Sequence, residues 1–86
     1  MKKITIYTTP YCPFCVRAKE LLKKKNIDFK EIDLSEDPEK FDEMIKKSNG
    51  ARTVPQIFVD DTHIGDCDYI HELDYKGELD KILGIK

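Results

Sequence analysis

The sequence lacks the features of a membrane protein and of a nucleic-acid-binding protein. No apolar run in its 86 residues approaches the roughly 18–20 residues that a membrane-spanning helix needs. Charged residues make up 37% of the chain, yet their signs nearly cancel and leave a net charge of -2. Because nucleic-acid-binding proteins typically carry a basic excess, we expect neither a membrane nor a nucleic acid as a partner.

Neither a signal peptide nor a disulfide framework is expected. Met1, Lys2 and Lys3 lead directly into a strand-like pattern, without the apolar segment and cleavage site of a secretory signal. The three cysteines are too few, and odd in number, for a small disulfide-stapled secreted protein. A chain of this length buries only about 60–65% of its unfolded surface and builds one core. We therefore expect a cytoplasmic protein in which residues 1–86 form one domain.

Two of the cysteines, separated by two residues, stand at a predicted strand-to-helix junction. The strand-like segment from Lys3 to Tyr7 precedes them, and Pro13 suits the first helical position because its φ is fixed and it has no N–H. Cys12 then lies at the positive end of the helix dipole, where unpaired backbone N–H groups stabilise a thiolate. We expect Cys12 to be an exposed nucleophile and Cys15, on the same helical face, to be a more buried resolving thiol.

The alternative for this cysteine pair is a structural zinc site. Such a site needs four ligands, typically a second Cys-x-x-Cys or two histidines three to five residues apart. The chain has no second pair of this kind, and eight positions separate His63 from His71. We therefore expect no metal, and we expect both histidines to be surface or packing residues.

Hydrophobic spacing divides the chain into alternating strands and helices. Strands are expected over about residues 3–7, 28–33, 56–59 and 62–64, and helices over about 13–25, from 37–38 to 49–50, from 65–66 to 77, and in a short terminal turn. Asn26 is expected to stop the first helix, and Asp37 to cap a second one that begins at Pro38. The order β-α-β-α-β-β-α predicts an α/β fold, a four-stranded mixed sheet with helices on both faces.

Three motifs in this order produce a resemblance that covers nearly the whole chain. Cys12-Pro13-Phe14-Cys15 follows the first strand, Thr53-Val54-Pro55 precedes the third, and Gly65-Asp66-Cys67-Asp68 precedes the last helices. With these motifs the chain resembles a glutaredoxin, a thiol–disulfide oxidoreductase of the thioredoxin fold. The resemblance implies a cis peptide bond before Pro55, which would turn the Val54 backbone toward Cys12.

The resemblance also implies that glutathione is the co-substrate and that no cofactor is tightly bound. The N–H groups of Cys67 and Asp68 would open a helix and hold a carboxylate, and the Asp68 side chain would meet an ammonium, which matches the γ-glutamyl end of glutathione. Arg52 is the nearest cation for the opposite, glycyl carboxylate. The implied glutathione site comprises Tyr11, Arg52, Thr53, Val54, Pro55, Cys67 and Asp68. Other partners would be glutathionylated or disulfide-bonded proteins, and the protein would be a monomer.

Three positions depart from the usual glutaredoxin pattern. Thr9 stands where a lysine or arginine is common, Phe14 where tyrosine is usual, and Asp66 where a second glycine is usual. The departures remove a cation and a hydroxyl and add a negative charge near the expected glutathione groove.

Other functions stay open at this point. One is a redoxin reduced by thioredoxin reductase in place of glutathione. Another is a noncatalytic carrier of an iron–sulfur cluster, held by Cys12 and glutathione between two chains, although Pro13 and Cys15 argue against this use. A third is a binding module that retains the fold without the chemistry.

Overall fold

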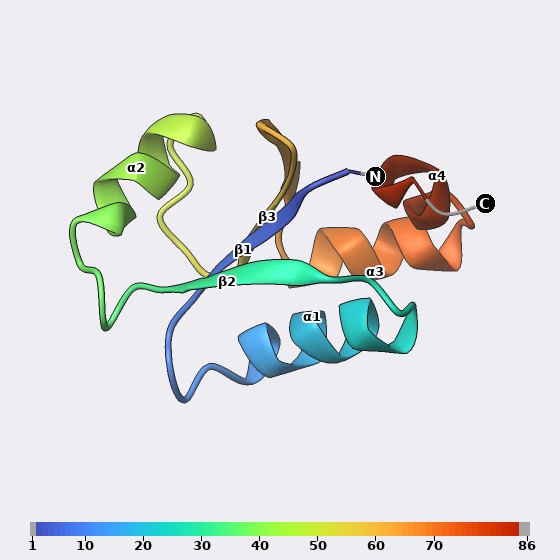
Figure 1. Ribbon diagram of the computed structural model, residues 1–86, viewed down its shortest axis with the longest axis horizontal. Helices are drawn as coiled ribbons and strands as arrows, with labels where there is room; N and C mark the ends of the chain where they lie inside the picture. The colour runs from blue at the N-terminus through green and yellow to red at the C-terminus, as the bar shows by residue number, and fades with distance from the viewer. Residues whose placement is uncertain (1, 85–86) are drawn as a thin grey trace.

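The computed structural model describes residues 2–84, which form one sheet flanked by helices (Figure 1). The strand order is β2-β1-β3-β4, with β1 and β2 parallel and the other pairs antiparallel. The predicted four-stranded mixed sheet is therefore confirmed. No helix within residues 2–84 has the length and apolar character to cross a membrane. In chain order the elements are β1 (Ile4–Thr8), α1 (Pro13–Lys24), β2 (Phe29–Asp33), α2 (Lys40–Lys47), β3 (Gln56–Val59), β4 (Thr62–Gly65), α3 (Cys67–Tyr75) and α4 (Leu79–Leu83).

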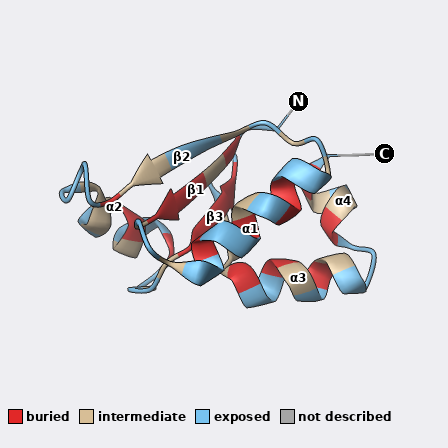
Figure 2. Cartoon of the chain, turned by 90° about the horizontal axis from the view of Figure 1, so that it is seen from below, coloured by how far each residue is buried: buried red, intermediate tan, exposed pale blue. Residues whose placement is uncertain are grey.

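Two hydrophobic cores lie on opposite faces of the sheet because successive side chains of a strand point to opposite sides. On one face Ile6 packs in a cluster with Leu22 of α1 and with residues of α3 and α4. On the other face Tyr7 and Phe58 pack with Met44 of α2. Figure 1 shows α2 on one side of the sheet and α1 and α3 on the other, and Figure 2 shows the buried residues concentrated in β1, β3 and the inner sides of the helices. The prediction of helices on both faces is confirmed.

One predicted helix boundary is wrong and another is right. Asn26 adopts a left-handed φ of 58° directly after the cap of α1, as expected for a helix stop. The helix α2, however, begins at Lys40 and not at Pro38, and Glu39 at its N-cap makes no side-chain capping bond. The Lys40 N–H donates to the Asp37 carbonyl at 2.9 Å. Such a bond spans three residues, so Asp37 and Pro38 begin a tight turn before the helix and do not cap it.

The sheet register brings the three motifs to one end of the molecule. The loop that leads into α1 follows Thr8, the last residue of β1. Gln56, the first residue of β3, pairs with Tyr7 near the same end of β1. Gly65, the end of β4, pairs with Ile57. The loop before α1, the loop before β3 and the start of α3 therefore meet at the same end of the sheet.

Candidate active site

Cys12 lies where the loop after β1 enters α1. Its backbone is extended (φ -99°, ψ 110°), it occupies the N-cap position, and Pro13 is the first helical residue. The Cys15 N–H donates to the Cys12 Sγ over 3.4 Å. The sulfur therefore meets an amide at the positive end of the helix, which is the placement that the sequence predicts and one that stabilises a thiolate.

Cys15 occupies a very different environment from Cys12. Its side chain is 1% exposed, whereas Cys12 is half-buried, and both are free thiols. Burial raises the pKa of Cys15 from its ordinary 9.0 to about 12, although a backbone hydrogen bond at Thr9 and the charge of Lys19 oppose the rise. Cys15 is thus a protonated thiol at neutral pH, and Cys12 is the sulfur of the pair that a substrate can reach.

The segment before β3 approaches Cys12 through a cis peptide bond. The Val54–Pro55 bond is cis, as the glutaredoxin resemblance implies. The Cys12 Sγ lies 3.9 Å from the Val54 carbonyl oxygen. Because Val54 precedes β3 and lies outside the ladder of β1 and β3, its backbone is placed to pair with an extended ligand beside the sulfur.

A groove of about 280 Å³ runs between this segment and the start of α3. Five of the seven residues predicted to bind glutathione line it, namely Thr53, Val54, Pro55, Cys67 and Asp68. Phe14 of α1 and Asp66 complete the lining. The tertiary structure therefore brings together two motifs that stand ten positions apart in the chain, next to the cysteine pair.

Tyr11 and Arg52 lie outside this groove. Tyr11 is fully exposed in the loop before α1, with a left-handed φ of 65°. Arg52 lines a second hollow together with Thr9 and Phe41. Since Val54 lines both the groove and this second hollow, Arg52 is on the far side of Val54 from the start of α3.

Asp66 has a structural role that the sequence analysis missed. Its carboxylate caps α3 by accepting the Tyr69 N–H at 3.0 Å. The signal was present in the sequence, since aspartate directly before a helix is a preferred N-cap. The capping bond uses the third amide of α3 and leaves the amides of Cys67 and Asp68, the first and second residues of the helix, facing its open end.

The third cysteine and both histidines make polar contacts with neighbouring residues. The Cys67 thiol is 2% exposed and its Sγ lies 3.4 Å from the His71 Nδ1. Burial raises the pKa of the Cys67 thiol, against the opposing charge of Arg17. The His71 Nδ1–H donates to the Cys67 carbonyl at 2.8 Å, and the His63 Nε2 lies 2.6 Å from the Gln56 Oε1. The prediction that both histidines are surface or packing residues is confirmed.

The sequence pattern also gave no sign of a polar cluster formed by Lys19, Glu31 and Thr8 near the cysteine pair. The Lys19 ammonium lies 3.0 Å from the Glu31 Oε2, and the Thr8 hydroxyl donates to the same oxygen at 2.7 Å. These two bonds lower the pKa of Glu31, with the Thr8 bond contributing more. Lys19 stands one turn after Cys15 on α1, so the cluster holds a positive charge near the buried thiol.

The described part of the chain offers no candidate metal site. Within residues 2–84, no three histidine, cysteine or acidic side chains are grouped so that they would hold an ion.

Comparisons with known proteins agree with this geometry. The family model described as Glutaredoxin matches residues 4–64. A glutaredoxin of Pseudomonas aeruginosa is 47% identical over 83 residues, which cover 96% of this chain and 98% of that protein. Glutaredoxin 3 of Escherichia coli K12 is 48% identical over 83 residues, covering 96% and 99%.

Solved structures of glutaredoxins share the fold. The solution structure of glutaredoxin from Brucella melitensis matches with a TM-score of 0.82 and 46% identity, over 96% of this chain and 89% of that one. A buckwheat glutaredoxin–glutathione complex matches with a TM-score of 0.85 and 27% identity, over 96% and 77%. A thioredoxin-like sheet, a Cys-x-x-Cys pair at a helix N-terminus and these relatives together establish that the chain belongs to the glutaredoxin family of thiol–disulfide oxidoreductases.

Proposed function

We propose that the protein is a glutathione-dependent oxidoreductase that reduces glutathione mixed disulfides and protein disulfides. One observation carries the proposal: the Cys12 Sγ lies 3.4 Å from the Cys15 N–H and 3.9 Å from the Val54 carbonyl oxygen, beside the groove that leads to α3. The neighbour from buckwheat, solved as a complex with glutathione, supports the same ligand class.

In the proposed reaction, the Cys12 thiolate attacks the glutathionyl sulfur of a mixed disulfide. A Cys12–glutathione disulfide forms, the substrate disulfide breaks, and the partner leaves as a thiolate that takes a proton from water. A second glutathione thiolate then attacks the glutathionyl sulfur on Cys12. Glutathione disulfide leaves, and the Cys12 thiolate returns to the amide at the mouth of α1, so Cys15 takes no part in this route.

Protein disulfides require the second thiol. Cys12 forms a mixed disulfide with one sulfur of the substrate, and the Cys15 thiolate displaces that sulfur to form an internal disulfide. Two electrons pass from the cysteine pair to the substrate, and two molecules of glutathione later return them. Because Cys15 is buried and its pKa is raised to about 12, loss of its proton is the costly event of this route.

The groove supplies contacts for the glutathione moiety. The N–H groups of Cys67 and Asp68 at the start of α3 would hold the γ-glutamyl carboxylate, and the Asp68 carboxylate would meet its ammonium. The Val54 backbone would pair with the cysteinyl unit, with Thr53 and Pro55 as further walls. The proposed contact of the glycyl carboxylate is Arg52, which requires glutathione to cross over Val54 toward the second hollow. Tyr11 is the remaining proposed contact.

The proposal extends to the state of the protein in the cell. We infer a cytoplasmic monomer whose residues 1–86 act as one domain, without a tightly bound cofactor. Analytical ultracentrifugation tests whether the protein is monomeric. A colourless protein purified without oxygen would count against an iron–sulfur cluster shared between two chains. A sedimenting dimer with an iron–sulfur absorption band would contradict this part.

The catalytic roles are tested with three single substitutions. Cys12→Ser should abolish the reduction of a glutathionylated peptide, while Cys15→Ser should retain it and lose only the reduction of protein disulfides. Cys67→Ser is the matched control and should retain both activities. Equal losses for Cys12→Ser and Cys15→Ser on the glutathionylated peptide would overturn the assignment.

The glutathione requirement is tested by changing the reductant. Oxidised protein should be regenerated by glutathione with glutathione reductase, and not by thioredoxin reductase with its own nicotinamide donor. Asp68→Asn should raise the KM for the glutathionylated peptide and leave kcat nearly unchanged, because Asp68 binds the ligand away from the reacting sulfurs. Regeneration by thioredoxin reductase alone would favour the rival redoxin.

A further inference from the structure

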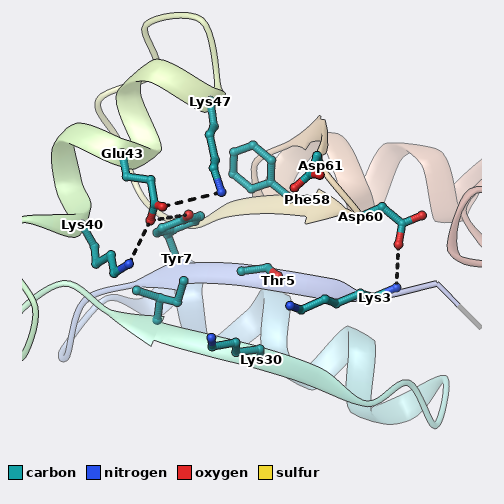
Figure 3. Close-up of a pocket in the computed structure, with 11 residues that line it drawn as sticks. Lys3, Thr5, Tyr7, Lys30, Lys40, Glu43, Lys47, Phe58, Asp60 and Asp61 are labelled. Atoms are coloured by element: carbon teal, nitrogen blue, oxygen red, sulfur yellow. Dashed lines mark hydrogen bonds and ion pairs between the residues drawn. The ribbon is translucent and has the colours of Figure 1, made fainter.

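Another hollow, distinct from the one that Arg52 lines, lies on the opposite face of the sheet from the cysteine-bearing helix. The helix α2 has only eight residues and covers one end of its sheet face. The remainder forms a hollow of about 310 Å³ between α2 and strands β1, β2 and β3 (Figure 3). This hollow shares no lining residue with the glutathione groove, so the proposed reaction does not account for it.

The lining of the hollow is rich in lysine. Lys3 precedes β1, Lys30 belongs to β2, and Lys40 and Lys47 lie at the two ends of α2. Four ammonium groups thus converge on one concavity of a chain whose net charge is -2. Figure 3 shows these side chains arriving from the strands on one side and from α2 on the other.

The acidic residues of the hollow are largely engaged. The Glu43 carboxylate accepts the Tyr7 hydroxyl at 3.2 Å and lies 3.5 Å from the Lys40 ammonium and 3.7 Å from that of Lys47. The Asp60 carboxylate accepts the Lys3 backbone N–H at 3.0 Å. Asp61 is the remaining acid, at the hairpin end of the hollow.

Two of the lysines are free to bind an anion. Among residues 2–84, neither Lys3 nor Lys30 has an ion-pair partner within 4.0 Å. Lys30 pairs across the parallel strands with Thr5, and Lys3 stands two residues before Thr5 on the same face. Since neighbouring strands lie about 5 Å apart, these three residues are neighbours on the sheet, and all three line the same hollow.

The shape and lining of the hollow indicate the kind of ligand. A concave site of this volume suits a small molecule, whereas a protein partner needs a broad surface. The aromatic floor is already covered, because Tyr7 is 1% exposed and Phe58 is 2% exposed, so a ligand meets polar groups. Two unpaired ammonium groups match a centre with two negative charges, and a phosphate monoester carries about 1.5 to 2 of them at pH 7.

We propose that this hollow binds a phosphate dianion between the ammonium groups of Lys3 and Lys30, with the Thr5 hydroxyl as a further donor. Lys47 supplies long-range attraction from α2. The shared chemistry is the tetrahedral dianion, which a free phosphate, a diphosphate or a small phosphomonoester presents.

The test follows backbone amide resonances while pyrophosphate is added to the reduced full-length protein. Saturable shifts are expected at Lys3, Thr5 and Lys30, and no comparable shifts at Cys67 or Asp68. Parallel titrations with inorganic phosphate and glycerol phosphate distinguish a free anion from a phosphomonoester. Potassium chloride at matched ionic strength measures the nonspecific contribution of salt.

Charge-matched variants decide whether the lysines form the site. Lys30→Gln and Lys3→Gln should each weaken pyrophosphate binding about tenfold, because each removes a charge-assisted hydrogen bond. Lys24→Gln, which removes the same charge from the exposed end of α1, should leave binding unchanged. The proposal is overturned if Lys24→Gln weakens binding equally, if potassium chloride reproduces the shifts, or if none of the three phosphate compounds shifts these resonances.

Discussion

The reduction of protein disulfides should be limited by the proton on Cys15. Burial is the main cause that raises the pKa of Cys15 from 9.0 to about 12. At pH 7 a thiol with that pKa is ionised to about 0.001%, against about 1% for a thiol with the ordinary value. Capture of Cys12 in a mixed disulfide removes the contribution of Cys12 to this pKa but leaves the burial. The rate of attack by Cys15 should therefore rise about tenfold per pH unit between about pH 6 and pH 9.

The assay isolates this step from the rest of the cycle. In a Cys67→Ser background, Cys12 is converted at acid pH into a mixed disulfide with thionitrobenzoate, a coloured leaving group. A stopped-flow jump to each higher pH then follows release of the coloured thiolate as Cys15 forms the internal disulfide. The logarithm of the rate should increase linearly with pH. If the rate instead levels off at or below pH 9.0, the ordinary pKa of a cysteine thiol, burial does not raise the pKa of Cys15.

Lys19 provides an independent check on the electrostatics. Its charge lowers the pKa of Cys15, so Lys19→Met should raise that pKa further and slow the release step at every pH. Lys23→Met, an exposed change on the same helix, should not. Deglutathionylation by the Cys15→Ser variant does not use Cys15, so adding Lys19→Met to it should change nothing. Equal slowing of that reaction would mean that Lys19 acts only through the structure.

Three further substitutions test the stability of the fold. Lys25→Met should lower the free energy of unfolding by about 1 kcal/mol in urea, because it removes the ammonium that ties α1 to two aspartates of the last helices. The pKa of Lys25 is raised above its ordinary 10.5, so this difference should be complete below pH 10.5 and be lost progressively as the pH rises from there through the raised pKa of the folded protein. The pKa of Tyr7 is raised from 10.0 to about 12, so the wild type should lose stability between these values and Tyr7→Phe should lose less, as urea midpoints against pH would show. Gly65→Ala should destabilise the fold and raise the KM for a glutathionylated peptide, because its Cβ would lie 2.7 Å from Tyr69 at a φ of 146°. Adding Tyr69→Ala should restore part of the loss, and an unchanged KM for Gly65→Ala would refute the reasoning.

Local sequence signals predicted the ends of helix α1 correctly, because at each end a single residue determines the backbone conformation. Pro13 set the start of α1 through its φ and its missing N–H, and Asn26 set its end through its tolerance of a left-handed conformation. The same logic failed at Asp37 and Pro38, which begin a four-residue turn closed by the bond from the Lys40 N–H to the Asp37 carbonyl. A cap followed by proline suits both the turn and the helix, and the choice between them depends on how α2 packs on the sheet.

The amino-acid sequence was sufficient to predict the order of strands and helices, the Cys-x-x-Cys pair at a helix N-terminus and the motifs of the family. The contacts between distant residues depended on how the chain folds in three dimensions. The folded chain separates Arg52 from the groove lined by Cys67 and Asp68 and pairs the Lys19 ammonium with the Glu31 carboxylate. It also leaves a lysine-lined hollow beside the short helix α2. The physical reason is that backbone conformation depends on neighbours a few positions away, whereas distances between segments depend on strand register and on how side chains fill the space between layers.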